Sequence, residues 1–183
     1  MEGFLEMDGR LLLWLKEFFS HPVLDNIMIF ISAMGNKGFI WIAIGLALLL
    51  YGFWKKQKQN GGLLVLLSLL ANFLACNVVL KPLIDRTRPY YVLDYIPVIP
   101  PVGDPSFPSG HTSASFAAAT AIYALNRKWG IVAYVFAAIM GFSRLYLGVH
   151  FPTDVAAGAL LGIVAAKVVI KLFDAKQRKK HDL

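Results

Sequence analysis

The chain has 183 residues, of which 57% are hydrophobic and 16% are charged, and its mean hydropathy is +0.60. Since a soluble domain carries about 25% charged residues, this composition argues against a soluble protein and favours an integral membrane protein. The net charge of +7 does not indicate a nucleic-acid partner, because the basic residues cluster at the ends of apolar runs. The length fits a single domain over residues 1–183.

The N-terminal region predicts a helix at the membrane surface. Three acidic residues within the first eight positions argue against a cleavable signal peptide, which begins with a basic segment. Asp8–Phe19 mixes apolar and charged residues, as a short amphipathic surface helix does. Pro22 then interrupts this helix. The short apolar run that follows, Val23–Met34, is the weakest candidate for a membrane span because Asp25 lies near its start.

Further along the chain, longer apolar runs approach the roughly 20 residues that cross a bilayer. They predict membrane-spanning helices over Phe39–Trp54, Gly61 to about Leu83, Ser109–Leu125, Gly130–Leu147 and Pro152–Phe173. Together with Val23–Met34 they predict an all-α membrane bundle of about six transmembrane helices plus the N-terminal amphipathic helix. The connection from Ile84 to Pro108 is rich in proline and tyrosine, which predicts a stiff cap, and loops of this length are usually functional or disordered.

The charges at the ends of these runs predict the orientation in the membrane. With six spans, both termini, the basic turns Lys55–Lys58 and Arg127-Lys128, and the basic tail from Lys176 lie on one side. Because cytoplasmic loops carry the excess of Lys and Arg, we expect this side to be cytoplasmic. The loop Lys81–His111 and the turn Arg144–His150 then meet on the extracytoplasmic side of the cell (plasma or inner) membrane.

The polar residues on this outer side each have an ordinary explanation. A lysine at a helix end, such as Lys81, commonly extends its amine to the interface. Ser109 suits a helix N-cap, and Asp154 suits the positive end of a helix dipole. Arg86 and Arg88 fit ordinary loop charges or contacts to phospholipid headgroups. These explanations do not account for the gathering of so many unusual polar groups at one membrane face, which instead predicts a common site.

A phosphate-binding site uses most of these groups. Phosphate oxygens need several cationic and N–H donors, and arginine offers a bidentate fork. Ser109–His111 opens a helix whose N-terminal amides can bind an anion, and Gly110 lets the backbone approach closely. The sequence therefore predicts that the phosphate group is bound by Lys81, Arg88, Ser109, Gly110 and Arg144.

Two histidines and one carboxylate predict the chemistry at this site. His150 and Asp154 are four residues apart, so the carboxylate can reach one imidazole nitrogen and leave the other as a nucleophile. His111 remains as the general acid that protonates the leaving oxygen. Because the two histidines must be in opposite protonation states, we expect a bell-shaped pH profile.

The same residues form three motifs whose pattern is similar to a known signature. They are Lys81-(six residues)-Arg88-Pro89, Pro108-Ser109-Gly110-His111, and Ser143-Arg144-(five residues)-His150-(three residues)-Asp154. Together they resemble the three-part signature of the type 2 phosphatidic acid phosphatase superfamily. The resemblance implies a phosphatase that uses no metal and no cofactor and forms a phosphohistidine at His150. It also implies Asp154 as the partner of His150, His111 as the proton donor, and a lipid phosphate in a lipid membrane as the substrate.

Three functions remain open at this stage. The leading one is an outward-facing lipid phosphatase, with undecaprenyl diphosphate and phosphatidylglycerophosphate as the first candidate substrates. A vanadate-dependent oxidoreductase would use the same anion site, but such enzymes are soluble and much longer. A non-catalytic binder or carrier of lipid phosphates would have little reason to keep His111, His150 and Asp154 together.

Overall fold

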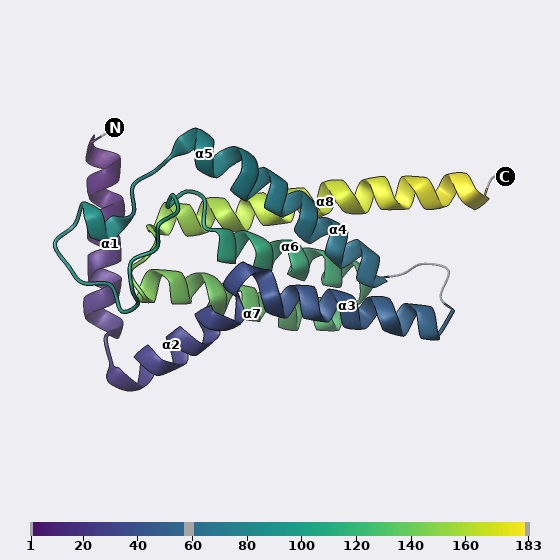
Figure 1. Cartoon of the computed structure of the whole chain (residues 1–183), viewed down its shortest axis with the longest axis horizontal. Coiled ribbons are helices and arrows are strands. Elements are labelled where there is room, and N and C mark those ends of the chain that lie inside the picture. The colour runs from purple at the N-terminus through teal and green to yellow at the C-terminus, as the bar shows by residue number, and fades with distance from the viewer. Residues whose placement is uncertain (1, 57–60, 182–183) are drawn as a thin grey trace.

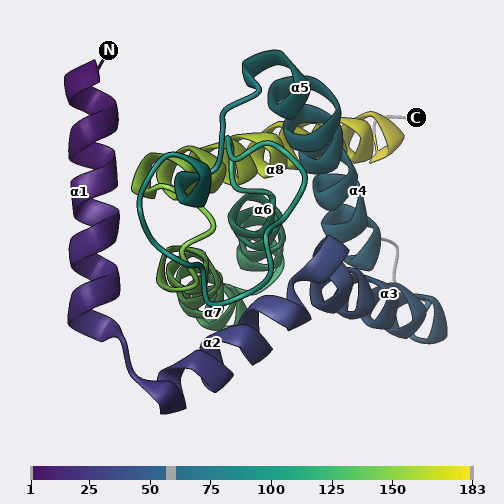
Figure 2. The same ribbon diagram turned by 60° about the vertical axis from the view of Figure 1, so that its left-hand side comes forward.

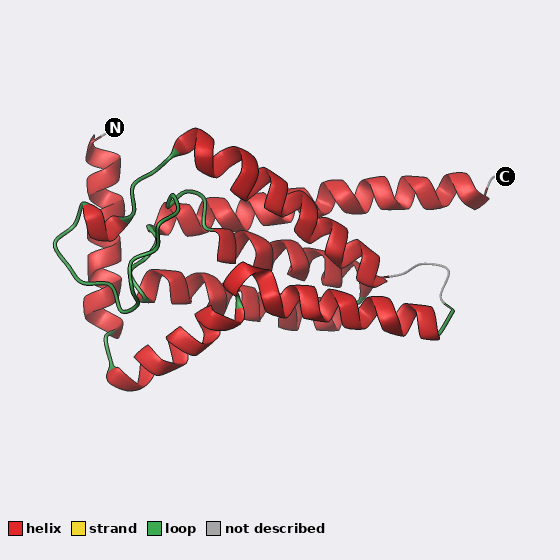
Figure 3. Cartoon of the chain, in the orientation of Figure 1, coloured by secondary structure: helices red, strands yellow, loops and turns green. Residues whose placement is uncertain are grey.

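The computed structural model describes residues 2–56 and 61–181, and the side chains within these ranges except those of residues 2–5 and 176–181. Lys58 of the expected basic turn, and the side chains of the expected basic tail, lie outside the described residues. Within the described ranges the regular secondary structure is entirely helical, loops connect the helices, and there is no strand (Figure 3).

The body of the fold is a bundle of long helices whose axes are roughly aligned and whose chain direction alternates from one helix to the next (Figure 1). Its members are α3 (Phe39–Trp54), α4 (Gly61–Phe73), α6 (Gly110–Leu125), α7 (Arg127–Tyr146) and α8 (Pro152–His181). Seen nearly end-on, α6 lies in the middle and the others surround it (Figure 2). Small side chains let the neighbouring helices approach α6 closely. Four of its alanines are fully buried: Ala117, Ala118, Ala119 and Ala121.

The observed bounds follow the predicted runs closely, with three differences at helix ends. The N-terminal helix, α1 (Glu2–Phe19), begins six residues before the predicted Asp8. Helix α7 begins at Arg127, three residues before the predicted start. Asn126 is the cause, because its side chain accepts hydrogen bonds from the backbone of Lys128 (3.0 Å) and Trp129 (3.2 Å) and so caps the helix. Helix α8 continues to His181, through the segment predicted to be a tail beyond Phe173.

Helix α4 reaches the first motif through an irregular segment. It continues as a π-helical stretch, η2 (Leu74–Leu80), and then as the single turn α5 (Lys81–Ile84). The helix stops at Asp85, whose φ of 43° lies in the left-handed region. Lys81 is therefore presented at the end of a helix, buried against the loop that follows.

The predicted count of about six membrane spans is not confirmed. By length and hydropathy, four helical stretches among the described residues can cross a membrane: Asn36–Trp54, Gly61–Tyr91, Arg127–Tyr146 and Pro152–Ala175. Helix α6 has 16 residues and is enclosed by the others. Helix α2 (Pro22–Met34) has 13 residues, or about 20 Å at 1.5 Å per residue, which is short of the roughly 30 Å hydrocarbon core.

The N-terminal helix lies at the end of the bundle that carries the motifs, here called the site end. Helix α1 (Glu2–Phe19) stands across this end, and α8 finishes at the opposite, far end (Figure 1). Contacts fix this placement, since Asp8 of α1 pairs with Arg86 at 2.7 Å and Met28 of α2 packs against Tyr146. The structure thus places the N-terminal helix at the site end and the end of α8 at the far end, because the short α2 does not carry the chain across the bundle. The membrane sides on which the two termini lie stay a prediction.

The predicted cap over the site end is present and is held by tyrosines. Tyr90 bonds through its hydroxyl to both the N–H (2.8 Å) and the C=O (2.9 Å) of Val102, which closes the loop on itself. Tyr95 donates to the carbonyl oxygen of Gly148 at 2.6 Å and so ties the cap to the turn before α8. The cap, which includes the 3₁₀ turn η3 (Pro89–Tyr91), is thereby fixed over the motif residues.

Candidate active site

Two of the three predicted phosphate-binding cations are brought together by a carboxylate of the cap. Lys81 pairs with Asp104 and also donates to the carbonyl oxygen of Pro105 at 2.8 Å. Arg88 donates through Nη2 to Oδ1 of Asp104 (2.7 Å) and through Nε to its carbonyl oxygen (2.8 Å). Partial burial acts to raise the pKa of Asp104, but the hydrogen bonds and charges of Lys81 and Arg88 outweigh it and lower the pKa to about 2. Asp104 is therefore an anion held where the sequence predicts a phosphate.

Arg144, the third predicted cation, is buried in the last turn of α7. Its Nη1 atom bonds to the hydroxyl of Ser32 on α2. Its Nε atom is buried and has no hydrogen-bond partner among the described residues. Because buried donors are normally satisfied, an open N–H beside a cavity is suited to a ligand oxygen.

His150 lies in the turn between α7 and α8 and is 1% exposed. Gly148 makes this turn possible with a φ of 71°, which a side chain would strain. The Nε2 atom of His150 is 3.4 Å from Nη1 of Arg88, and its Nδ1 atom is 3.5 Å from Oδ2 of Asp154. Burial lowers the pKa of His150 to about 3; Asp154 acts to raise it, while the charges of Arg88 and Arg144 lower it. The imidazole is therefore neutral at pH 7.

Asp154, in the first turn of α8, makes its shortest hydrogen bonds to groups other than His150. Oδ2 accepts from the hydroxyl of Ser106 (2.5 Å) and from the backbone N–H of Phe151 (2.9 Å). Oδ1 accepts from Nη1 of Arg86 at 2.6 Å. The predicted contact between His150 and Asp154 is present but long, because Pro152 starts the helix between the two residues.

His111 is held from the side of α2 and α3, at the short helical turn η1 (Asn36–Gly38) that joins them. Its Nε2 atom lies 3.1 Å from Oδ1 of Asn36. Gly35 packs against the ring so closely that a Cβ there would lie 2.9 Å from Cδ2 of His111. The start of α6 and the α2–α3 junction thus meet at this histidine.

The two other predicted residues, Ser109 and Gly110, take different positions. Gly110 lines the cavity described below. Ser109 is not among the lining residues; its hydroxyl accepts from Thr112 (3.0 Å) and its N–H donates to the carbonyl oxygen of Asp154 (3.0 Å). In this structure Ser109 joins α6 to α8 and does not face the cavity.

A single cavity of about 700 Å³ collects most of the predicted residues. Six of the eight line it: Lys81, Arg88, Gly110, His111, Arg144 and His150. The large apolar side chains on one side of the lining come from α3 and α4: Ile42, Leu66, Leu69, Leu70 and Phe73. Further polar groups in the lining are Lys37, Asn72, Asn77 and Asp104. The cavity therefore combines a cationic, histidine-bearing end with an apolar side inside the bundle.

Sequence reasoning missed several residues that complete the site. Asp104 and Ser106 lie in the irregular cap, where no periodicity singles them out. The sequence predicts only a loop charge or a headgroup contact for Arg86, although its place two residues before Arg88 puts it at the site end. Asp8 is separated from the first motif by more than seventy residues, and no signal in the sequence connects it to the site.

Comparison with known proteins decides the family. The family model described as the PAP2 superfamily matches residues 61–178, which is more than half of the chain and includes all three motifs. The chain belongs to the PAP2 superfamily. Its matched relatives are PAP2 lipid phosphatases, which hydrolyse phosphate monoesters or diphosphates without a metal ion, and the chain is an enzyme of this class embedded in a membrane.

Curated and solved relatives of this PAP2 protein act on several lipids. The chain is 31% identical to undecaprenyl-diphosphatase BcrC of Bacillus subtilis, covering 84% of this chain and 77% of that protein. It is 30% identical to the lipid A 4'-phosphatase of Porphyromonas gingivalis, covering 94% and 75%. Its structure matches the phosphatidylglycerolphosphate phosphatase of Bacillus subtilis with a TM-score of 0.79 and 29% identity, covering 96% and 88%.

A bacterial vanadium-dependent iodoperoxidase shares the fold at a TM-score of 0.65 and 16% identity, covering 90% of this chain and 48% of that one. At this level of identity the likeness concerns the fold alone. It does not support the alternative that this chain is an oxidoreductase.

Proposed function

We propose that this protein removes a phosphate or diphosphate group from a membrane lipid through a phosphohistidine intermediate on His150. The observation that carries the proposal is the single cavity that holds both histidines and three cations at one end and apolar side chains along its side. A lipid phosphate has the same two parts, a charged head and a hydrocarbon tail.

The cationic end binds the phosphate in this proposal. Lys81, Arg88 and the unpartnered Nε of Arg144 offer their donors to the phosphate oxygens. Asp104 now occupies donors of Lys81 and Arg88, so the substrate must displace this carboxylate or share its partners. Gly110 leaves room for the anion beside the first turn of α6.

The reaction then proceeds in two steps, transfer of the phosphoryl group to His150 and hydrolysis of the phosphohistidine. In the first, Nε2 of His150 attacks phosphorus, the P–N bond forms, and the bond from phosphorus to the leaving oxygen breaks. His111 gives a proton to that oxygen, which leaves as the lipid alcohol or lipid phosphate. In the second step water attacks the phosphohistidine, the P–N bond breaks, and His111 receives the proton lost by water.

The arrangement of the two histidines supports these roles. Nδ1 of His150 faces Asp154 and Ser106, so its other nitrogen is the one that faces Arg88. Nε2 of His111 now pairs with the side-chain oxygen of Asn36, and a leaving oxygen can take the place of that acceptor.

The apolar side of the cavity supports a long-chain substrate. Leu70 and Phe73 line it and are 53% and 50% exposed, so the cavity reaches the outer surface of α4, which faces lipid in a membrane. Undecaprenyl diphosphate and phosphatidylglycerophosphate are our first candidates. Lipid A phosphates join them because a relative is named for that activity.

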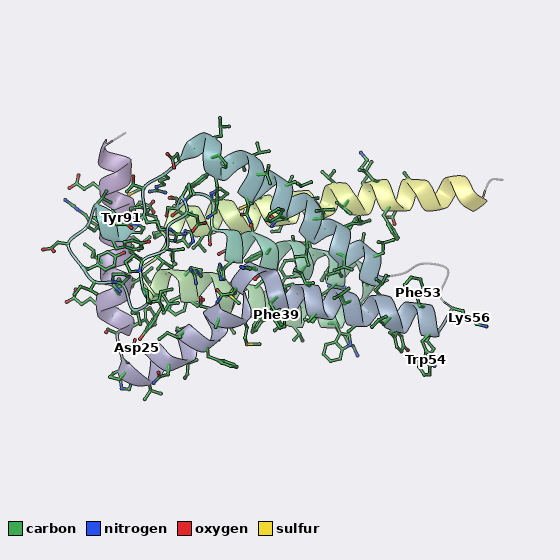
Figure 4. All side chains as sticks on the ribbon, in the orientation of Figure 1. Asp25, Phe39, Phe53, Trp54, Lys56 and Tyr91 are labelled. Carbon is green, nitrogen blue, oxygen red and sulfur yellow. The ribbon has the colours of Figure 1, made fainter. Side chains whose placement is uncertain are left out.

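We further propose that the site faces the extracytoplasmic side of the cell membrane. The far end of the bundle carries Lys56 beside the exposed Phe53 and Trp54, whereas Tyr91 lies at the site end (Figure 4). Arg127 and Lys128 begin α7, and with Lys55 they make the far end basic, as the cytoplasmic side is. Helix α1 then lies on the outer surface with its exposed apolar stripe, Met7, Leu11, Trp14 and Phe18, against the lipid.

A phosphate-release panel on the purified protein in detergent tests the proposal. The substrates are undecaprenyl diphosphate, undecaprenyl phosphate, phosphatidylglycerophosphate, phosphatidic acid and a lipid A 4'-phosphate, each with and without excess chelator. We expect release from at least one, unchanged by chelator, and a labelled, acid-labile phosphoenzyme that is absent from His150→Ala. Near-normal turnover by a folded His150→Ala protein contradicts the mechanism.

A further inference from the structure

Helix α1 contributes one buried carboxylate to the site end, although most of its described surface is exposed. The side chain of Asp8 is 2% exposed, while its neighbours Glu6, Met7 and Arg10 are exposed. A buried carboxylate is costly unless it is paired and fully hydrogen-bonded. The partners of Asp8 therefore indicate what the burial is for.

Those partners all belong to the surroundings of Asp154. Oδ2 of Asp8 accepts from Nη2 of Arg86 at 2.7 Å and bonds to the hydroxyl of Thr153. Oδ1 accepts from the backbone N–H of Thr153 at 3.1 Å. Thr153 immediately precedes Asp154 in the first turn of α8. Asp8 thus binds both the backbone next to Asp154 and Arg86, the cation that pairs with Asp154.

Arg86 is the link between the two carboxylates. Its Nη1 atom donates to Oδ1 of Asp154 (2.6 Å) and to the hydroxyl of Thr153 (2.8 Å), and its Nη2 atom donates to Asp8. The guanidinium also stacks over the ring of Phe151, 4.0 Å from its centroid. A guanidinium held by two carboxylates and a ring has a fixed plane, so the position of Asp154 depends on all of them.

We propose that Asp8 is a positioning residue that acts through Arg86 on Asp154, so that the N-terminal helix is part of the catalytic apparatus. The proposal rests on the proposed roles of His150 and Asp154. With Asp8 in place, Arg86 is shared between two carboxylates and Asp154 stays basic enough to orient the imidazole. Without it, the full charge of Arg86 falls on Asp154, and Thr153 loses its anchor.

Kinetics of Asp8→Asn test the proposal in the full-length protein, with phosphate release from the best substrate of the panel. We expect kcat to fall about 10–100-fold, the loss typical of residues that orient a reacting group without touching the substrate. We expect KM to change less than about threefold. Glu6→Gln is the matched control, because Glu6 is an exposed acid on the same helix that pairs with Arg10 (2.6 Å) and not with the site. It should retain the parental kcat.

Two further variants separate positioning from loss of packing. Leu12→Ala loosens α1 through its fully buried leucine without touching the ion pair. Arg86→Gln combined with Asp8→Asn should cost little more than Arg86→Gln alone, because the two residues act as one unit. If Asp8→Asn does not fold in detergent, Thr153→Val, which removes the hydroxyl between Asp8 and Arg86, should show a smaller loss of the same kind.

The pH profile of kcat/KM supplies a readout that mere loosening does not reproduce. The charged and polar groups around His150 are Asp154 and Ser106 at Nδ1, Arg88 at Nε2, and Arg144, His111, Lys81 and Asp104 in the same cavity. Removing the negative charge of Asp8 disfavours the imidazolium, so the acidic limb stays at or below that of the parent. Loosened packing admits water and moves the limb up toward the ordinary pKa of histidine.

The kinetics of Asp8→Asn and His150→Ala together distinguish failure of the role of Asp8 from failure of the proposed mechanism. A folded Asp8→Asn protein with the parental kcat overturns the inference, as does a profile and kinetic loss equal to those of Leu12→Ala. If His150→Ala in the same assay keeps its turnover, the proposed mechanism fails. If His150→Ala is inactive while Asp8→Asn is fully active, only the role of Asp8 is lost.

Discussion

The Nδ1 atom of His150 lies 3.5 Å from Oδ2 of Asp154, farther than a strong hydrogen bond. The same oxygen accepts a bond of 2.5 Å from the hydroxyl of Ser106, which is itself 3.5 Å from Nδ1. Ser106 therefore stands beside both members of the pair. The orientation of the imidazole at Nδ1 therefore depends on two side chains, Asp154 of α8 and Ser106 of the cap.

Ser106→Ala should lower kcat by about tenfold and leave KM nearly unchanged. The substitution removes one short hydrogen bond from Asp154 and widens the space around His150, whereas Asp154→Asn should cost about 1,000-fold or more because it removes the charge that stabilises the imidazolium. Steady-state phosphate release measures both. Ser68→Ala is the control, since Ser68 is buried in α4, away from the site, and donates to the carbonyl oxygen of Leu64 at 2.8 Å. Equal kcat values for Ser106→Ala and the parent would contradict the role of Ser106.

Asp104→Asn should strengthen inhibition by inorganic phosphate by about 3–10-fold. In the parent, phosphate competes with the carboxylate for Lys81 and Arg88, so only the fraction of molecules with free cations binds it. The measurement is the inhibition constant of phosphate at constant ionic strength. Weaker inhibition would show instead that Asp104 orders the two cations for the substrate.

The acidic limb of kcat/KM should lie well below the ordinary histidine value of 6.5. Burial lowers the pKa of His150 to about 3, so the nucleophile stays unprotonated as the pH falls through 6 and 5. The substrate phosphate titrates near pH 6, and its own titration by phosphorus NMR must be subtracted. A limb near 6.5 after that correction would mean that His150 is solvated in the working enzyme.

Much of this fold could be predicted from the sequence, because long apolar runs indicate helices and the polar motifs at their ends indicate the site. The run Phe39–Trp54 coincides with α3, because its apolar length fits one helix and the lysines that follow it mark the helix end. The three motifs placed six residues around one cavity. The topology at the N-terminus did not follow, because a 13-residue apolar run does not reveal whether it crosses the bundle or lies against its end.

The residues around Asp154 could not be predicted for a different reason. Asp8, Arg86 and Ser106 come from three separate elements, and only tertiary structure brings them to one carboxylate. Nothing in the local sequence of α1 distinguishes Asp8 from an exposed acid such as Glu6.

Gly162→Ala should destabilise the protein by about 1–3 kcal/mol, the usual cost of overpacking. A Cβ at Gly162 of α8 would collide with the carbonyl oxygen of Ser113 and lie 2.8 Å from the N atom of Ala117, both of them backbone atoms of α6 that cannot turn aside. Thermal unfolding in detergent provides the measurement. Gly103→Ala is the control, because nothing lies within 4 Å of a Cβ at that position in the cap. An unchanged melting temperature for Gly162→Ala would mean that α6 and α8 are less closely packed.

Single cysteines should show which parts of the chain share a membrane side. The native Cys76 is fully buried and gives little background with an impermeant maleimide. In intact cells we expect Glu6→Cys and Asp94→Cys to be labelled, because α1 and the cap lie together at the site end, and Lys56→Cys to be labelled only after lysis. Labelling of Asp94→Cys alone would return the N-terminus to the cytoplasm. It would also separate Asp8 from Arg86 in the native membrane, so this experiment bears on the structure and on the role of α1 together. Labelling of Lys56→Cys alone in intact cells would instead place the site on the cytoplasmic side.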